Sequence, residues 1–336
     1  MQTTIETSRE SIESAVGLRA TTRASESGRG LARFASFVVV YNIAVILWGA
    51  YVRATGSGAG CGNHWPLCNG QILPGTAQSQ TLIEFTHRVT SGLSLVLMAV
   101  LLVWCWRRTT KGDWPRYSLM SAAILLFSEA ILGAMLVLFE HVGLDRSASR
   151  AVFLCLHFGN TLLLVAALVL TAKWLSNGAR RFVLSAKRHE RMLIAIGLLC
   201  VMATGMTGSL AALGDTIFNG ETLTGALTQD FSANSQVLLR LRLLHPVAAA
   251  IAFFYVLWMM RKVSKNRDES SRTLPLLTTT MLAQVALGVL NVLLLAPVWL
   301  QITHLFVAEI FWIMLVLASA QVLVKNREMV AEAKTS

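Results

Sequence analysis

The stretch IEFTHRVTSGLSLVLMAVLLVWCW (83–106) begins with an acid, an imidazole and a guanidinium and then stays apolar to Trp106. A run of about 20 apolar residues is long enough to cross the ~30 Å hydrocarbon core of a bilayer as a helix. Ionisable side chains near lipid are costly, and in membrane helices they are candidates for function. This stretch therefore predicts a membrane helix with Glu84, His87 and Arg88 as candidate functional residues near one end.

Apolar runs of this kind recur along all 336 residues, of which 54% are hydrophobic and only 14% charged. A soluble domain carries ~25% charged residues. The runs are 35–52, 85–106, 118–139, 152–172, 192–213, 243–260, 274–296 and 299–324. We expect an all-α polytopic membrane protein with eight transmembrane helices.

The basic residues indicate how these helices are oriented. Of the 29 Lys and Arg, 23 lie in the segments 1–33, 107–117, 173–191, 261–273 and 325–336. Because cytoplasmic segments of membrane proteins are enriched in Lys and Arg, both termini are predicted to be cytoplasmic, in the inner (plasma) membrane. The net charge of +11 then reflects topology and contact with membrane lipid, and nucleic-acid binding is not expected. Two tails lie outside the predicted helices, 1–33 and 327–336. The first is rich in Ser, Thr, Glu and Arg and is expected to be disordered or loosely amphipathic.

The two halves of the chain resemble each other. EAILGAMLVL (129–138) matches QVALGVLNVL (284–293), and EFTHRVTSG (84–92) aligns with RLLHPVAAA (242–250). Four helices per repeat give both repeats the same orientation, so an axis along the membrane normal is expected to relate them. The pattern predicts two pseudo-symmetric four-helix bundles, 34–175 and 188–326.

Four of the seven histidines share one depth. His87, His157, His245 and His304 each fall within two turns of the outer end of an even-numbered apolar run, two in each repeat. Paired imidazoles on facing helices of a bundle are typical of haem ligated by two histidines. Zinc fits poorly because no Cys or carboxylate accompanies each pair at ligand spacing. Hydrogen-bonded interior histidines are the alternative interpretation.

The repeats differ three residues before their first histidine, where one has Glu84 and the other has Arg242. Residues three apart lie on one face of a helix. Arg242, with Arg240, is suited to pair with haem propionates, whereas Glu84 is suited to take up or pass on a proton beside a reacting group. The alternatives are an ion pair between Glu84 and Arg88, and arginines that extend to the membrane interface.

GAYVRATGSGAGCGNHWPLCNG (49–70), IEFTHR (83–88) and the histidines at 157, 245 and 304 resemble the haem A synthase family. The resemblance covers all eight helices. It implies an oxidoreductase that oxidises the C8 methyl of haem O, through the alcohol, to a formyl group and so supplies haem A to terminal oxidases.

The resemblance also implies a division of the site residues. His245 and His304 would ligate a haem b cofactor, His87 and His157 would hold the iron of the substrate, and Glu84 would be the catalytic carboxylate. The ends of the first-loop motif would be Cys61 and Cys68, in an outer loop where a disulfide is permitted, either as a structural staple or as a redox-active pair. Haem O synthase and an electron donor such as a ferredoxin would be partners, and a homo-oligomer stays open.

Two other functions remain from the residues alone. A membrane cytochrome with two bis-histidine haems would transfer electrons without altering a substrate, and a haem transporter would bind haem reversibly in the N-terminal half. The acid at Glu84 distinguishes the enzyme from the electron carrier, which has no need of an acid beside one haem only. The roles of Glu129 and Glu309, both inside apolar runs, stay open.

Overall fold

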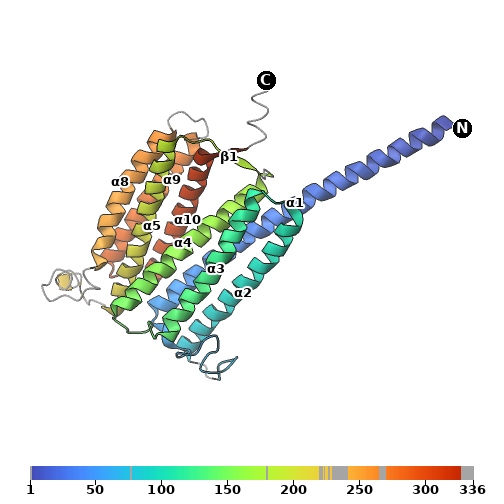
Figure 1. Cartoon of the computed structure of the whole chain (residues 1–336). Coiled ribbons are helices and arrows are strands. Elements are labelled where there is room, and N and C mark those ends of the chain that lie inside the picture. The colour runs from blue at the N-terminus through green and yellow to red at the C-terminus, as the bar shows by residue number, and fades with distance from the viewer. Residues whose placement is uncertain are drawn as a thin grey trace.

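A computed structural model of the chain describes residues 2–75, 78–178, 181–218, 222, 224–225, 228, 241–264 and 270–326. Eight long helices in these ranges have the length and apolar composition to cross a membrane. They are α1 (Gln2–Ala54), α2 (Ser79–Arg108), α3 (Trp114–Leu138), α4 (Ala148–Ser176), α5 (Arg188–Ile217), α8 (Leu244–Ser264), α9 (Ser270–Leu293) and α10 (Val298–Leu323). The predicted all-α polytopic fold is confirmed (Figure 1).

The first helix is longer than the apolar run predicted at 35–52. It begins at Gln2 and runs without a break into the membrane-spanning part, Gly28–Ala54, and in Figure 1 its first turns extend away from the other helices. No proline occurs before Pro66, so no residue of α1 lacks the backbone N–H that a helix requires. The assignment of 1–33 as a separate cytoplasmic tail stays a prediction.

The helices form two groups of four. In the first group, α2 and α4 both pack on α1 and α3, and in the second, α8 and α10 both pack on α5 and α9. The helices of each pair, α2 with α4 and α8 with α10, therefore lie diagonally across their group. The groups meet where α4 and α1 pack on α5 and α10, as Figure 1 shows for α4 and α5. The predicted pseudo-symmetry of the bundles stays a prediction.

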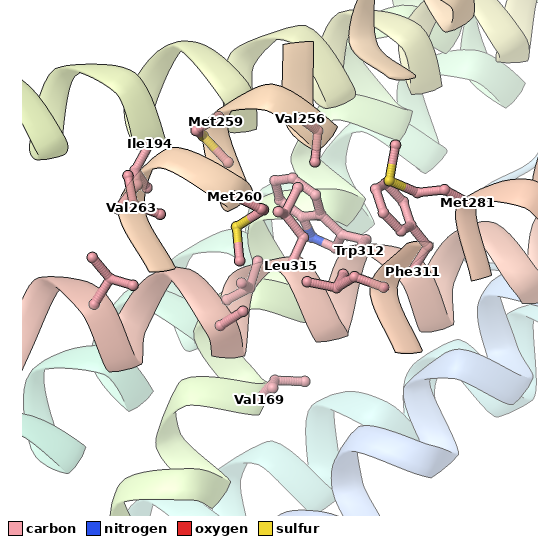
Figure 2. Close-up of a cluster of buried hydrophobic side chains, with 14 of the residues drawn as sticks. Val169, Ile194, Val256, Met259, Met260, Val263, Met281, Phe311, Trp312 and Leu315 are labelled. Carbon is pink, nitrogen blue, oxygen red and sulfur yellow. The ribbon is translucent and has the colours of Figure 1, made fainter. Parts of the chain in front are cut away.

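The largest buried hydrophobic cluster lies where the two groups meet. Figure 2 shows Val169 of α4, Ile194 of α5 and the α10 residues Trp312 and Leu315 converging there. The indole N–H of Trp312 donates a hydrogen bond of 2.8 Å to the backbone oxygen of Leu162 on α4. Because a buried indole N–H without an acceptor is costly, this bond fixes α10 against α4.

Short elements close both ends of the helical bundle. At one end β1 (Phe182–Leu184) pairs antiparallel with β2 (Val324–Asn326). At the other, a loop follows α1, contains the 3-10 helix η1 (Ser57–Ala59), and is closed by a disulfide between Cys61 and Cys68. The disulfide implied by the family resemblance is therefore present.

Candidate functional site

Each of the four predicted histidines packs its ring against a glycine of the helix that precedes it in the bundle. The pairs are His87 (α2) with Gly49 (α1), His157 (α4) with Gly133 (α3), His245 (α8) with Gly208 (α5), and His304 (α10) with Gly288 (α9). A β-carbon at these glycines would lie 2.9, 3.8, 3.0 and 3.3 Å, respectively, from Cε1 of the ring. Glycine thus permits the close approach of a helix backbone to His87, His245 and His304, whereas the 3.8 Å at Gly133 is an ordinary van der Waals contact.

These glycines were not predicted as site residues. Gly133 and Gly288 occupy the same position in the two matching segments 129–138 and 284–293, which was the available signal. Their equivalent contacts, together with those of the other two glycines, support the internal repeat at the level of the site.

The two C-terminal histidines lie close together, and their role as ligands of one metal ion stays a prediction. The ring centroids of His245 and His304 are 6.4 Å apart and the ring planes are perpendicular. Nδ1 of His245 lies 3.1 Å from the backbone oxygen of Thr204, so it is the protonated nitrogen and Nε2 is left for a metal. Since bonds from a metal to imidazole nitrogen are ~2.0 Å long, the spacing admits one ion between the rings.

His304 has a different surrounding from His245. The side-chain nitrogen of Gln284 on α9 lies 3.1 Å from its Nε2, and this amide would give up the contact if Nε2 bound a metal. Nδ1 of His304 is buried and has no hydrogen-bond partner. Burial of a polar nitrogen without a hydrogen-bond partner costs free energy, and a bound ligand would offset this cost.

The N-terminal pair also carries unpartnered nitrogens. Nδ1 of His87 and Nδ1 of His157 are both buried and accept or donate no hydrogen bond. The two rings are near enough to interact electrostatically, and a carboxylate oxygen of Glu129 lies 3.4 Å from Nδ1 of His157. The assignment of both pairs as ligands of haem iron stays a prediction. Among the described residues no group of three or more His, Cys, Asp or Glu could hold a metal ion.

Glu84 is buried, with 3% of the residue exposed, and is held by the first outer loop. One carboxylate oxygen accepts a 2.8 Å hydrogen bond from the backbone N–H of Cys61. The other lies 2.6 Å from the guanidinium of Arg88, one turn along α2. The ion pair with Arg88, the alternative interpretation, is thus present, and the catalytic role of Glu84 stays a prediction.

Arg88 joins this ion pair to the loop. Its Nη1 donates to the backbone oxygens of His64 and Leu67, at 2.5 and 2.6 Å. Both acceptors lie between the two disulfide-bonded cysteines. The disulfide loop is therefore held on α2 by one acid and one guanidinium beside His87.

Of the two arginines predicted as propionate partners, the structure describes one. Arg242 forms an ion pair of 2.9 Å with Asp215 of α5. Arg240 lies outside the described residues. The sequence did not single out Asp215, whose position near the end of a long apolar run was the available signal.

Arg53 is a further residue that the sequence did not single out. It lies in the 49–70 motif, and its guanidinium donates to the backbone oxygen of Ala212, to the hydroxyl of Thr216 and to the side-chain oxygen of Gln301, at 2.5, 2.8 and 2.9 Å. These acceptors belong to α5 and α10. One side chain of α1 therefore ties the first helical group to α5 and α10 of the second at the end that carries the disulfide loop.

The loop before α4 is organised around Asp145. Burial alone would raise the pKa of this carboxyl, but hydrogen bonds from Ser147 and His141 outweigh it and lower the pKa below its ordinary value of 3.8. The Ser147 hydroxyl also accepts a hydrogen bond from the backbone N–H of Arg150 and so caps α4. This loop sets where the helix that carries His157 begins.

A polytopic all-α membrane protein with two pairs of half-buried histidines on diagonal helices is the class that this fold and site define. Residues 32–316 match the family model COX15-CtaA, described as cytochrome oxidase assembly protein. The chain belongs to this family, which confirms the resemblance drawn from the first-loop and helix motifs.

Individual relatives agree with the family match. The chain is 39% identical, over 302 residues, to a Thermus thermophilus protein named protoheme IX farnesyltransferase; the match covers 89% of this chain but only 50% of that protein. It is 29% identical over 301 residues to a heme A synthase of Halalkalibacterium halodurans, covering 84% of this chain and 94% of the relative. A heme A synthase of Exiguobacterium sibiricum is 28% identical over 84% of this chain and 92% of its own length. The chain thus spans about half of the Thermus relative and nearly all of the other two.

Proposed function

We propose that this protein is a haem A synthase, an oxidoreductase that converts the C8 methyl of haem O through the alcohol to the formyl group of haem A. The observation that carries the proposal is the arrangement of four half-buried imidazoles, two in each helical group, each packed on a glycine. Relatives named heme A synthase that match over nearly their whole length support the reaction.

The two pairs of imidazoles have different tasks in this proposal. His245 and His304 hold haem b, which supplies an iron that accepts and releases single electrons. His87 and His157 hold the iron of the substrate. Arg242 and Arg240 pair with haem propionates, and Asp215 orients the first of these guanidinium groups.

Glu84 handles protons released at the substrate methyl. Arg88 and the N–H of Cys61 hold its carboxylate in one position, and the disulfide loop above it limits the access of water. A fixed carboxylate with a defined orientation is suited to proton transfer, because general acid–base catalysis requires the group within hydrogen-bond reach of the proton.

The partners follow from the same chemistry. The Thermus relative named protoheme IX farnesyltransferase is about twice as long as the part that matches, which supports a haem O synthase as the partner that delivers the substrate. An electron-transfer protein such as a ferredoxin serves as the redox partner. The protein lies in the plasma membrane with both termini in the cytoplasm, as the distribution of Lys and Arg favours.

The decisive experiment is to express the chain with a haem O synthase, purify it, extract its haems with acid and identify them by mass. A haem A synthase yields haem b together with haem A or the alcohol intermediate, whereas an electron-transfer cytochrome yields haem b alone. His157→Ala serves as the matched control and is expected to retain haem b but to form no haem A. Recovery of haem b alone from the wild-type protein, with haem O present in the same membranes, contradicts the proposal.

A further inference from the structure

The last histidine of each helical group has a different polar neighbour. In the first group a carboxylate oxygen of Glu129 lies 3.4 Å from Nδ1 of His157. In the second, the matching position in the repeat is Gln284, whose amide nitrogen lies 3.1 Å from Nε2 of His304. Nδ1 of both rings is buried and makes no hydrogen bond in the structure, but only that of His157 is faced by an acid. One ring thus has an acid beside Nδ1 and the other has only a neutral amide, on its opposite nitrogen.

Glu129 is held by donors on both of its oxygens. The hydroxyl of Thr161 donates to the oxygen that faces His157, and the side-chain amide of Asn160 donates to the other at 2.5 Å. The orientation of Asn160 is fixed, because its amide nitrogen also donates to the backbone oxygen of Leu125 and its oxygen accepts from Ser128. Two donors suit an ionised carboxylate, and the carboxyl of Glu309 on α10 is the further group near enough to interact with it electrostatically.

The second group lacks this surrounding. Where the first has Asn160 and Thr161, three and four residues after its histidine, the second has Val307 and Ala308. Where the first has Ser128 before its acid, the second has Ala283 before Gln284. The acid and the side chains that hold it therefore differ together between the two repeats.

We propose that Glu129 is a positioning residue that accepts a hydrogen bond from Nδ1–H of His157 and makes this imidazole a stronger electron donor to iron than His304. A carboxylate on the outer nitrogen of a ligating histidine fixes the ring and raises its basicity. A more basic ligand stabilises the oxidised iron, so an iron held at His157 has the lower reduction potential of the two. Electrons then pass from the N-terminal site to the C-terminal site. This inference rests on the proposed binding of one haem at each pair.

The test is a redox titration of the full-length protein, followed by the absorbance of its haems, with iron protoporphyrin added to fill the N-terminal site. The transition that disappears in His157→Ala identifies the N-terminal haem. In Glu129→Gln we expect the midpoint potential of the N-terminal haem to rise by ~59 mV, which for one electron is a tenfold change in the equilibrium constant of reduction. The midpoint of the C-terminal haem stays where it is.

Thr161→Val is the matched second variant, because it keeps Glu129 but removes the hydroxyl that shares its oxygen with His157. In Thr161→Val we expect the midpoint potential of the N-terminal haem to fall, which is the opposite sign to Glu129→Gln. The inference therefore remains testable if Glu129→Gln does not fold. An unchanged midpoint in Glu129→Gln with the N-terminal haem bound, or a rise in both variants, overturns the inference and leaves the proposed enzyme standing. A wild-type protein that binds no haem at His157 overturns both.

Discussion

His245 lies directly on Gly208, and a β-carbon at this glycine would come within 3.0 Å of Cε1 and 3.2 Å of Nδ1 of the ring. The same Nδ1 lies 3.1 Å from the backbone oxygen of Thr204, one turn earlier on α5. The face of α5 thus sets both the position and the orientation of this imidazole. Any group added at Gly208 has to move the ring or the helix.

Gly208→Ala is therefore expected to weaken haem b binding. At 3.0 and 3.2 Å from an added β-carbon, the ring must give way by a few tenths of an ångström, and loss of the support behind a metal-ligating histidine typically lowers affinity ~10–100-fold. Titration of the haem-free protein with haem b, followed by absorbance, measures the change. Gly92→Ala on α2 is the control, because a β-carbon there meets nothing within 4 Å; equal affinity in the two variants would contradict the seating of His245 on Gly208.

Arg88→Gln is expected to destabilise the protein more than Glu84→Gln. Without Arg88, the Glu84 carboxylate stays buried with the Cys61 N–H as its remaining donor, and removing one partner of a buried pair costs ~3–5 kcal/mol. Without the charge on Glu84, Arg88 still donates to two loop carbonyls. Thermal unfolding of both variants and the double variant in detergent measures this. The double variant should be less destabilised than the sum, because the residues are in contact.

The same variants separate anchoring of the loop from chemistry at Glu84. Thr81→Val removes another tie between α2 and the loop, the 2.8 Å hydrogen bond from Thr81 to the backbone oxygen of Gly60, without touching Glu84. If Glu84 transfers protons, Glu84→Gln lowers haem A formation by ~10²–10⁴, whereas Thr81→Val has a small effect. A comparable loss of haem A in both would assign Glu84 to anchoring alone.

Replacement of Arg53 by Met is expected to loosen the contact between the helical groups. The change keeps an apolar stem but removes the donors to Ala212, Thr216 and Gln301. Hydrogen bonds that involve a charged group contribute ~1.5–3 kcal/mol each, so the apparent melting temperature should fall clearly. Arg107→Met, at an exposed site in the last turn of α2, is the control, and equal melting temperatures of the two variants would argue against the role of Arg53.

Cys61 and Cys68 are expected to lie outside the cell. After reduction of intact cells, a membrane-impermeant thiol reagent should label both, because the segments on the other side of the membrane carry 23 of the 29 Lys and Arg. The double variant with Ser at both positions shows the background from Cys105, Cys155 and Cys200. Labelling that requires cell lysis would reverse the predicted orientation.

The loop before α4 is expected to open in acid. The pKa of Asp145 is lowered in the folded protein from its ordinary value of 3.8. Its contribution to stability is therefore present above that value and is lost as the pH falls through the lower, folded pKa. Hydrogen exchange of residues 140–151 at decreasing pH measures the opening. Asp145→Asn should exchange faster at neutral pH and lose the acid dependence; an unchanged pH profile would exclude Asp145 as the cause.

The long elements were predictable because each transmembrane helix is specified by a local apolar run. The four histidines and the first-loop cysteines were also found in the sequence, since their positions repeat or belong to a motif. The contact of His245 with Gly208 was not, because it depends on how two helices rotate against each other. The same holds for Arg53, whose three acceptors lie 159 to 248 residues further along the chain.

The short strands β1 and β2 were missed because three residues carry no periodic signal. For Glu84, the residue and its ion-pair partner could be predicted from the sequence. Its contacts with the disulfide loop could not, because they depend on how the loop folds back onto α2.

The pairing of β1 with β2 has a consequence for biogenesis. Phe182 pairs with Asn326, so a segment made before α5 hydrogen-bonds to one made after α10. During synthesis the N-terminal helices α1–α4 emerge first and have their mutual partners at once. The segment at 182–184 instead waits until α10 has been inserted before its strand partner exists. The C-terminal group therefore closes last, and a ribosome stalled before residue 324 would leave it open at this end.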